Sequence, residues 1–239
     1  EKCSKKKGQA KQQRRCKDCI AENREVSLAA TNDAPPLSCT DGGEGASDED
    51  LFKQPPPRDE CPICMLTLPL DLAEQRYRAC CGKIVCFGCT HAIRRKDNNR
   101  TLCPFCRSPD ITTDESIGRI KKRADGDDAV AAYELGGLYN HGREGLPKDR
   151  RKAFELWLRA GELGEARAHY SIGYAYYSGR GVRVEKDKEK AKYYYEVAAM
   201  GGSVKARYNL GIFEWNAGNM NRAVRHLMIS GGGGCCSLR

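Results

Sequence analysis

Apolar residues in the C-terminal half of the chain recur at the spacing of an amphipathic helix. Three stretches place them at positions i, i+4 and i+7, and a second such series follows each stretch after a glycine-marked loop. The first series are Ala131, Leu135 and Leu138; Ala168, Ile172 and Ala175; and Ala206, Leu210 and Phe213. The second are Ala153, Trp157 and Ala160; Ala191, Tyr195 and Ala198; and Ala223, Leu227 and Ser230. Because small residues let helices cross closely, this pattern predicts three helical hairpins between residues 127 and 231.

The hairpins also repeat in sequence. Tyr-Glu-Leu-Gly at 133–136, Tyr-Ser-Ile-Gly at 170–173 and Tyr-Asn-Leu-Gly at 208–211 occupy equivalent places. The pattern resembles the Sel-one-like repeat, a relative of the tetratricopeptide repeat, with copies at about 127–164, 165–202 and 203–231. The resemblance implies an all-α solenoid of stacked hairpins whose concave side binds protein substrates.

Ten of the eleven tyrosines lie within these repeats. Tyr133, Tyr170 and Tyr208 stand at equivalent positions, so we expect them to fill gaps between hairpins. Aromatic residues nearer the ends of the first helices are better candidates for a substrate groove. These candidates are Tyr139, Tyr176, Tyr177 and Trp215.

Residues 1–60 show no comparable periodicity. They are basic at first, then acidic and proline-rich, and they contain too few apolar residues to offset the entropy lost on ordering. We therefore predict disorder over residues 1–60 and in the glycine-rich tail at 232–239. A connector helix is predicted within residues 108–126, with Ile117 and Ile120 on one side.

The chain contains 14 cysteines, and four pairs of them are separated by two residues. Cys16 and Cys19 form one pair, and the segment 3–19 fits either part of a zinc ribbon or a disordered basic tail. The other three pairs, with the adjacent Cys80 and Cys81, place eight cysteines within residues 61–107. Eight thiolates fill two closed four-coordinate zinc sites, which are structural because a catalytic zinc keeps one position open.

The cysteines can also be read as disulfides. The sequence shows no apolar core of an export signal and no apolar run long enough to span a membrane. These observations favour metal ligands in an intracellular protein, either cytoplasmic or nuclear, over disulfides in a secreted one.

The order of the cysteines in residues 61–107 resembles the RING finger. The segment begins with Cys-Pro-Ile-Cys, continues through Cys-Cys-Gly-Lys-Ile-Val-Cys-Phe-Gly-Cys and ends with Cys-Pro-Phe-Cys-Arg. The resemblance implies a small α+β module stapled by two structural zinc ions in a cross-brace. It assigns Cys61, Cys64, Cys86 and Cys89 to one ion, and Cys80, Cys81, Cys103 and Cys106 to the other. His91 is either a substitute ligand or, as we expect, a solvated side chain on the following helix.

RING ubiquitin ligases typically carry apolar residues and an arginine at fixed positions around the two zinc sites, where they contact the ubiquitin-conjugating enzyme. The corresponding residues here are Ile63, Ile93, Pro104 and Arg107. The resemblance implies a ligase that recruits a conjugating enzyme through this surface and a substrate through the repeats. Such a ligase has no covalent catalytic residue, because it acts by holding the reactants in position.

Two other classes of function remain open. A zinc-stapled module without ligase activity would serve as an interaction scaffold. The net charge of +9 and the basic segments 2–17, 94–96 and 121–123 would suit nucleic acid, but these segments lack interleaved aromatic residues, so we do not expect that partner. No phosphate-binding glycine motif accompanies the four scattered histidines, so a separate active site is not indicated.

Overall fold

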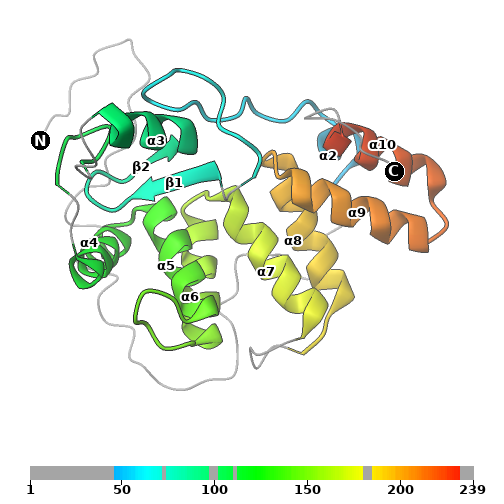
Figure 1. Ribbon diagram of the computed structural model, residues 1–239. Helices are drawn as coiled ribbons and strands as arrows, with labels where there is room; N and C mark the ends of the chain where they lie inside the picture. The colour runs from blue at the N-terminus through cyan, green and yellow to red at the C-terminus, as the bar shows by residue number, and fades with distance from the viewer. Residues whose placement is uncertain (1–45, 72–73, 97–101, 110–111, 180–184, 232–239) are drawn as a thin grey trace, which may run out of the picture. The chain divides into compact units, whose positions relative to one another are not determined.

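The computed structural model describes residues 46–71, 74–96, 102–109, 112–179 and 185–231 (Figure 1). Residues 1–45, which include the segment 3–19, and the tail 232–239 lie outside the described residues, so the predictions made for them are not tested. The described chain contains a small cysteine-rich module with a two-stranded sheet, followed by a helical solenoid.

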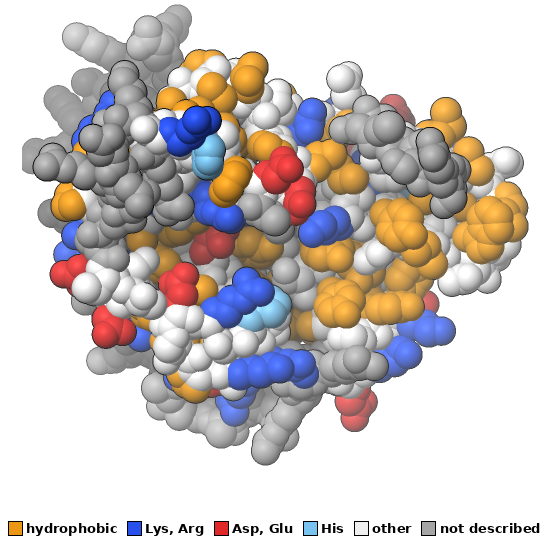
Figure 2. All heavy atoms as spheres, viewed as in Figure 1, with side chains coloured by type: hydrophobic (Ala, Val, Ile, Leu, Met, Phe, Trp, Pro, Cys, Tyr) orange, Lys and Arg blue, Asp and Glu red, His pale blue; other side chains and the backbone are white. Residues whose placement is uncertain are grey.

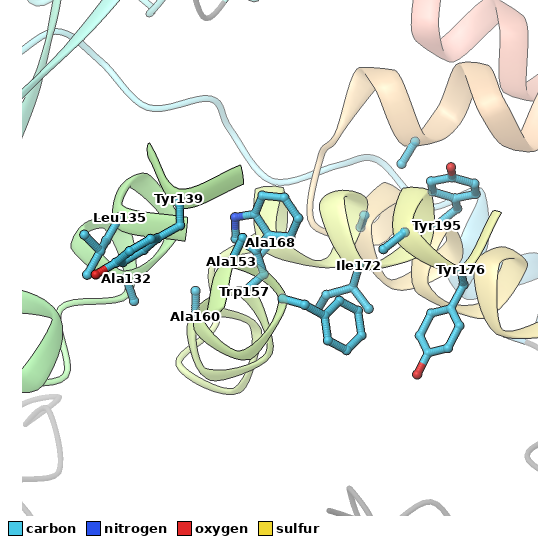
Figure 3. Packing of buried hydrophobic residues seen from close by; sticks show 14 of the residues in the cluster. Ala132, Leu135, Tyr139, Ala153, Trp157, Ala160, Ala168, Ile172, Tyr176 and Tyr195 are labelled. Atoms are coloured by element: carbon cyan, nitrogen blue, oxygen red, sulfur yellow. The ribbon is translucent and has the colours of Figure 1, made fainter. Parts of the chain in front are cut away.

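Three helical hairpins occupy residues 129–231 as the structure describes them. The first pairs α5 (Ala129–His141) with α6 (Arg150–Glu162), and the second pairs α7 (Ala166–Ser178) with α8 (Lys188–Met200). The third pairs α9 (Val204–Asn216) with α10 (Met220–Gly231). Most of the predicted apolar positions are buried in one core, and Figure 3 shows the side chains of α5 to α8 packed there.

Short polar side chains start most of these helices. Asp128, Asp149, Asp187 and Ser203 each accept a hydrogen bond from the backbone N–H three residues later. Helices α5 and α7 end at glycines with left-handed backbone, Gly142 and Gly179, where a residue with a side chain would be strained. Local sequence therefore sets where α5, α6, α8 and α9 begin and where α5 and α7 end.

The predicted connector is helix α4 (Thr113–Asp125), and Ile117 and Ile120 are buried on one side as expected. Its role is larger than that of a connector, because it packs on α5 as the second helix of a hairpin packs on the next hairpin. The turn after α4 also has the backbone of the turns after α6 and α8. In each turn an N–H reaches back five residues, from Asp128 to Arg123, from Glu165 to Ala160 and from Ser203 to Ala198. Helix α4 is thus the second half of an incomplete repeat that covers the start of the solenoid.

The cysteine-rich module is built around an antiparallel pair of strands. Strand β1 (Gln75–Arg78) pairs with β2 (Lys83–Cys86), with Gln75 opposite Cys86, and α3 (Phe87–Lys96) follows directly. Leu68 and Val85 form a small core. A bond from the Arg123 side chain of α4 to the carbonyl of Ala79, 3.2 Å long, links the module to the solenoid. Arg123 also pairs with Asp128 at 3.2 Å, so this residue of the basic segment 121–123 has partners within the fold.

The prediction of disorder is wrong for residues 46–60. Asp48–Leu51 form the short helix α2, and the Leu51 side chain is fully buried in the same core as the repeats. The Arg207 guanidinium of α9 donates a hydrogen bond to the Leu51 carbonyl, and the His226 ring of α10 packs on Phe52. The local composition predicted disorder because the residues that order this segment lie more than 150 positions away along the chain.

The buried His226 makes the stability of the protein depend on pH. Burial, together with the positive charge of Arg207, lowers the pKa of the His226 imidazole to about 4. An imidazole in the unfolded chain has a pKa of about 6.5, so between these two pKa values only the unfolded state binds the proton. The contribution of His226 is present above pH about 6.5 and is lost as the pH falls to about 4, and it amounts to about 3 kcal/mol.

Urea unfolding at pH 7 and pH 4 measures this effect. We expect the free energy of unfolding of the His226→Gln variant to fall less with pH than that of the wild type, with a difference of about 3 kcal/mol. His91→Gln is the control, because His91 is exposed. Parallel pH dependences of the wild type and the His226 variant would contradict the prediction.

Candidate functional site

The eight cysteines predicted as ligands gather into two groups of four among the described residues. One group contains Cys61, Cys64, Cys86 and Cys89, and the other contains Cys80, Cys81, Cys103 and Cys106. Within each group all sulfur atoms lie within 4.8 Å of one another. The two groups have the membership that the resemblance to the RING finger implies, and they interleave along the chain.

Two loops with the same backbone supply one pair of cysteines to each group. In the first loop the N–H of Cys61 donates to the Leu66 carbonyl at 2.8 Å, and in the second the N–H of Cys103 donates to the Ser108 carbonyl at 2.7 Å. The residues after each pair, Met65 and Arg107, both have positive φ, at 57° and 60°. The Cys-Pro-x-Cys motif thus forms the same tight turn twice and points both of its sulfurs to one side.

The remaining cysteines come from the hairpin and the start of α3. Cys80 and Cys81 lie in the turn between β1 and β2, where Gly82 has a left-handed backbone with φ of 69°. Cys86 ends β2 and Cys89 lies in the first turn of α3. One hairpin therefore contributes cysteines to both groups.

The sulfur positions fit a tetrahedral metal ion in each group. Four thiolates at about 2.3 Å from a central ion are about 3.8 Å apart. The Sγ atoms of Cys64 and Cys86 are 3.9 Å apart, those of Cys81 and Cys103 are 3.8 Å apart, and those of Cys80 and Cys106 are 3.5 Å apart. Each group can therefore hold one ion with no position left for water.

Backbone hydrogen bonds lower the pKa of one cysteine in each group. Burial raises the pKa of the Cys61 thiol, but hydrogen bonds from the N–H groups of Cys86, Cys64 and Ile63 outweigh it and lower the pKa to about 6. The pKa of Cys103 falls to about 6 for the same kind of reason, through the N–H groups of Cys106 and Phe105. Burial and the neighbouring thiols raise the pKa of Cys80 to about 12. A cation would supply the positive charge that four thiolates in one group require.

His91 lies outside both groups. Its side chain is exposed on α3, and its ring stacks on Phe87 with 6.1 Å between centroids. The interpretation of His91 as a solvated side chain, rather than a substitute ligand, agrees with this position.

The four residues predicted to contact a conjugating enzyme differ in exposure. Arg107 is exposed directly after the second loop, while Ile63 and Ile93 are half-buried. Pro104 is buried inside the second loop and has little surface to offer a conjugating enzyme. Exposed apolar side chains in or directly after the two loops include Phe105, Met65 and Leu66. None of these three residues was among those predicted from the sequence, although two apolar residues directly after the Cys-Pro-x-Cys segment at 61–64 are a visible signal.

Two of the predicted groove residues, Tyr139 and Tyr176, are buried and cannot face a partner. Their backbone carbonyls accept hydrogen bonds from the N–H groups of Asp149 and Asp187, which begin the second helix of each hairpin. Their rings lie under the Lys152 and Lys190 ammonium groups, at 5.5 and 5.6 Å. They are therefore structural residues that close the inter-helix loops.

The exposed aromatic side chains of the first helices lie on a different face from the buried Tyr139 and Tyr176. Tyr177 and Trp215 are exposed as predicted, but Tyr208, expected to fill a gap, is 55% exposed. Tyr174 and Ile212 are exposed beside them. Figure 2 shows hydrophobic side chains gathered over this part of the molecule. We call Tyr174, Tyr177, Tyr208, Ile212 and Trp215 the aromatic stripe. A second i, i+4, i+7 series in α9, at positions 208, 212 and 215, is the signal that would have found it.

A pocket of about 630 Å³ lies between the first helices α5 and α7 and the hairpin of the cysteine-rich module. Arg167 is held there by the carboxylates of Glu165 and Glu134, at 2.8 and 3.3 Å, and by the ring of Tyr133. Burial lowers the pKa of Arg167, but the two carboxylates outweigh it and raise the pKa above its usual value. Arg143, Arg150 and Lys205 also line the pocket, so its lining is basic overall.

Comparison with known proteins finds similarity in the helical repeats. The family model "Sel1 repeat" matches residues 129–165 and 166–203. These residues correspond to the first two hairpins, and no RING family model matches the cysteine-rich segment. Among the helices that the structure describes, none is both long and apolar enough to cross a membrane.

A curated relative is the ERAD-associated E3 ubiquitin-protein ligase component HRD3B of Arabidopsis thaliana, 30% identical over 113 residues. The match covers 47% of this chain and 17% of that protein, so the chain spans about a sixth of the relative's length.

Similar solved structures include a Sel1 repeat protein from Oxalobacter formigenes, 29% identical with a TM-score of 0.45, covering 51% of this chain and 92% of that one. The protective antigen c5321 of uropathogenic Escherichia coli is 31% identical with a TM-score of 0.45, over 50% of this chain and 26% of that one.

Proposed function

We propose that this protein is a zinc-binding RING-type ubiquitin-protein ligase. The observation that carries the proposal is the pair of interleaved four-cysteine groups, closed by two loops of identical backbone and followed by the exposed Arg107. All eight candidate donors are cysteine sulfurs, in groups of four whose spacing fits tetrahedral coordination, and such a set suits zinc. In the proposed role the two ions are structural.

The cysteine-rich module would act by positioning. Arg107 has positive φ, and its exposed guanidinium carries five donors in a planar fork, which suits two partners at once. Phe105, Met65 and Leu66 supply apolar surface near the two loops, where a ubiquitin-conjugating enzyme would bind. The chain would bring the enzyme's thioester to an acceptor lysine at productive distance and form no covalent bond of its own.

The repeats would select the protein substrate. The aromatic stripe offers apolar surface, and the basic pocket beside it favours an acidic segment. The name of the Arabidopsis relative describes a component of a ubiquitin ligase, and its similarity to this chain covers 113 residues. This supports a link between these repeats and ligase assemblies.

Reconstituted autoubiquitination with a panel of conjugating enzymes tests the ligase. We expect Arg107→Ala to reduce the rate by about tenfold, which corresponds to about 1.4 kcal/mol of lost positioning, with zinc content unchanged. Arg119→Ala, at an exposed arginine of α4, is the matched control and should retain the wild-type rate. Absence of activity with every enzyme in the panel would contradict the proposal.

A non-catalytic scaffold is the second candidate. It is favoured by the fact that the family match covers the first two repeats and does not extend to the cysteine-rich segment. A protein that retains zinc and binds partners through the aromatic stripe, but shows no ubiquitin transfer, would be this scaffold.

A further inference from the structure

Three polar side chains are buried in the third hairpin beneath α2. Arg207 and Glu214 are each 2% exposed, and His226 is fully buried. The first two hairpins carry different residues at these places, namely Ala132 and His169, Tyr139 and Tyr176, and Leu156 and Tyr194. Burial of charged groups is costly unless they have partners, so this arrangement indicates a built site rather than a repeat of the general pattern.

Helix α2 shows what this site recognises. The Arg207 guanidinium donates to the carbonyl of Leu51 at the end of the short helix, and Leu51 fills the space between the repeat helices. Asp48 pairs with Arg222 at 2.6 Å. Phe52 lies between the His226 ring, at 4.6 Å between centroids, and the Arg225 guanidinium, at 3.7 Å. The side-chain contacts of α2 are thus made by an aspartate, a leucine three residues later and a phenylalanine directly after it.

The chain's own segment satisfies this site only in part. Arg207 Nε and one terminal nitrogen, and both ring nitrogens of His226, have no hydrogen-bond partner among the described residues although they are buried. Helix α2 has four residues, too few to be stable without the surface beneath it. Residues 46–52 thus pack on the solenoid as a short segment that residues 53–60 join to the cysteine-rich module.

We propose that the surface formed by α8, α9 and α10 is a binding site for short helical segments of another protein with the pattern Asp-x-x-Leu-Phe, and that residues 48–52 are a displaceable internal occupant. The segment that joins α2 to Cys61 makes a second contact with the rest of the chain. Pro56, Pro57 and Arg58 line a pocket of about 470 Å³ together with Leu68 of the cysteine-rich module and Tyr170 of the repeats. An external segment that displaces α2 would also release these residues from the pocket.

Binding of a fluorescent peptide with the sequence of residues 46–58 tests the proposal in the full chain, measured by anisotropy. We expect the Leu51→Ala/Phe52→Ala variant to bind this peptide at least about tenfold more tightly than the wild type, because a tethered competitor present at high effective concentration has been removed. Asp48→Ala/Phe52→Ala, which keeps Leu51, is a second releasing variant and should behave in the same way.

Added to either releasing variant, Arg225→Ala should weaken peptide binding by at least about fivefold, because Arg225 is exposed and contacts Phe52. Arg151→Ala on the exposed face of α6 is the control and should have no effect. Equal binding by wild type and released variants, or binding by neither when circular dichroism shows intact helices, would overturn the proposal. A wild-type dimer that the peptide dissociates would identify a second copy as the occupant and overturn it as well.

Discussion

Removal of metal by a strong chelator is expected to unfold the cysteine-rich module while the repeats stay folded. Structural zinc contributes on the order of 10 kcal/mol per ion to the folding of a small module. The described part of this module has only the small core around Leu68 and Val85, so we expect its stability to depend on bound metal. The repeats have a separate, larger core, and circular dichroism at 222 nm should keep most of its amplitude.

Measurement of the metal content of the wild type and of a Cys61→Ser variant tests this prediction further. The wild type should contain two metal ions per chain, and replacement by cobalt should give the absorption of tetrahedral thiolate sites. Cys61→Ser should lose more than one ion, because β2 and α3 bring Cys86 and Cys89 into the first group while the preceding turn supplies the second. The double change Cys235→Ser/Cys236→Ser is the control and should retain both ions. Loss of a single ion by Cys61→Ser, with the other site intact, would contradict the coupling.

Two neighbouring glycines of α5 are expected to respond in opposite directions to the same substitution. A Cβ atom on Gly136 would lie 2.6 Å from Nε1 of Trp157 and 3.1 Å from the backbone carbonyl of Ala153. The Trp157 ring is largely buried and rigid, so the helices would have to separate. We expect Gly136→Ala to lower the free energy of unfolding by about 2–3 kcal/mol, the usual cost of overpacking a core.

Gly137→Ala is the matched control. A Cβ atom at Gly137 meets nothing within 4 Å, and replacing a helical glycine by alanine removes conformational freedom from the unfolded chain. We expect this variant to be more stable than the wild type by about 0.5–1 kcal/mol. Urea unfolding followed at 222 nm compares the two variants. A stabilised Gly136 variant would show that the close contact between α5 and α6 is absent in solution.

The same contact explains why the repeat signature contains a glycine. Gly173 faces the ring of Tyr195 and Gly211 faces Leu227, with Cβ distances of 2.9 Å in both cases. The recurring Tyr-x-x-Gly segments predicted hairpins, and small residues predicted a close crossing. The identity of the large residue opposite each glycine became clear only when the two helices were placed together.

The errors in the predicted groove have a related cause. Tyr139 and Tyr176 were chosen because they lie near the ends of the first helices, but the rotational position of a residue around a helix decides which face it occupies. Tyr139 lies four residues after the buried Leu135 and therefore shares its face. The positions of Tyr208, Ile212 and Trp215 form an independent helical series, and the structure exposes them.

The sequence by itself determined the features that depend on short-range spacing. It indicated the cluster of eight cysteines, the two Cys-Pro-x-Cys turns and the hairpins, because tight turns and helix caps involve residues within a few positions of one another. Only the tertiary structure decided how α2 is ordered, that α4 completes a half-repeat and which aromatic residues reach the surface. In each case the deciding partner is distant along the chain, as Arg207 is from Leu51, and local composition carries no record of it.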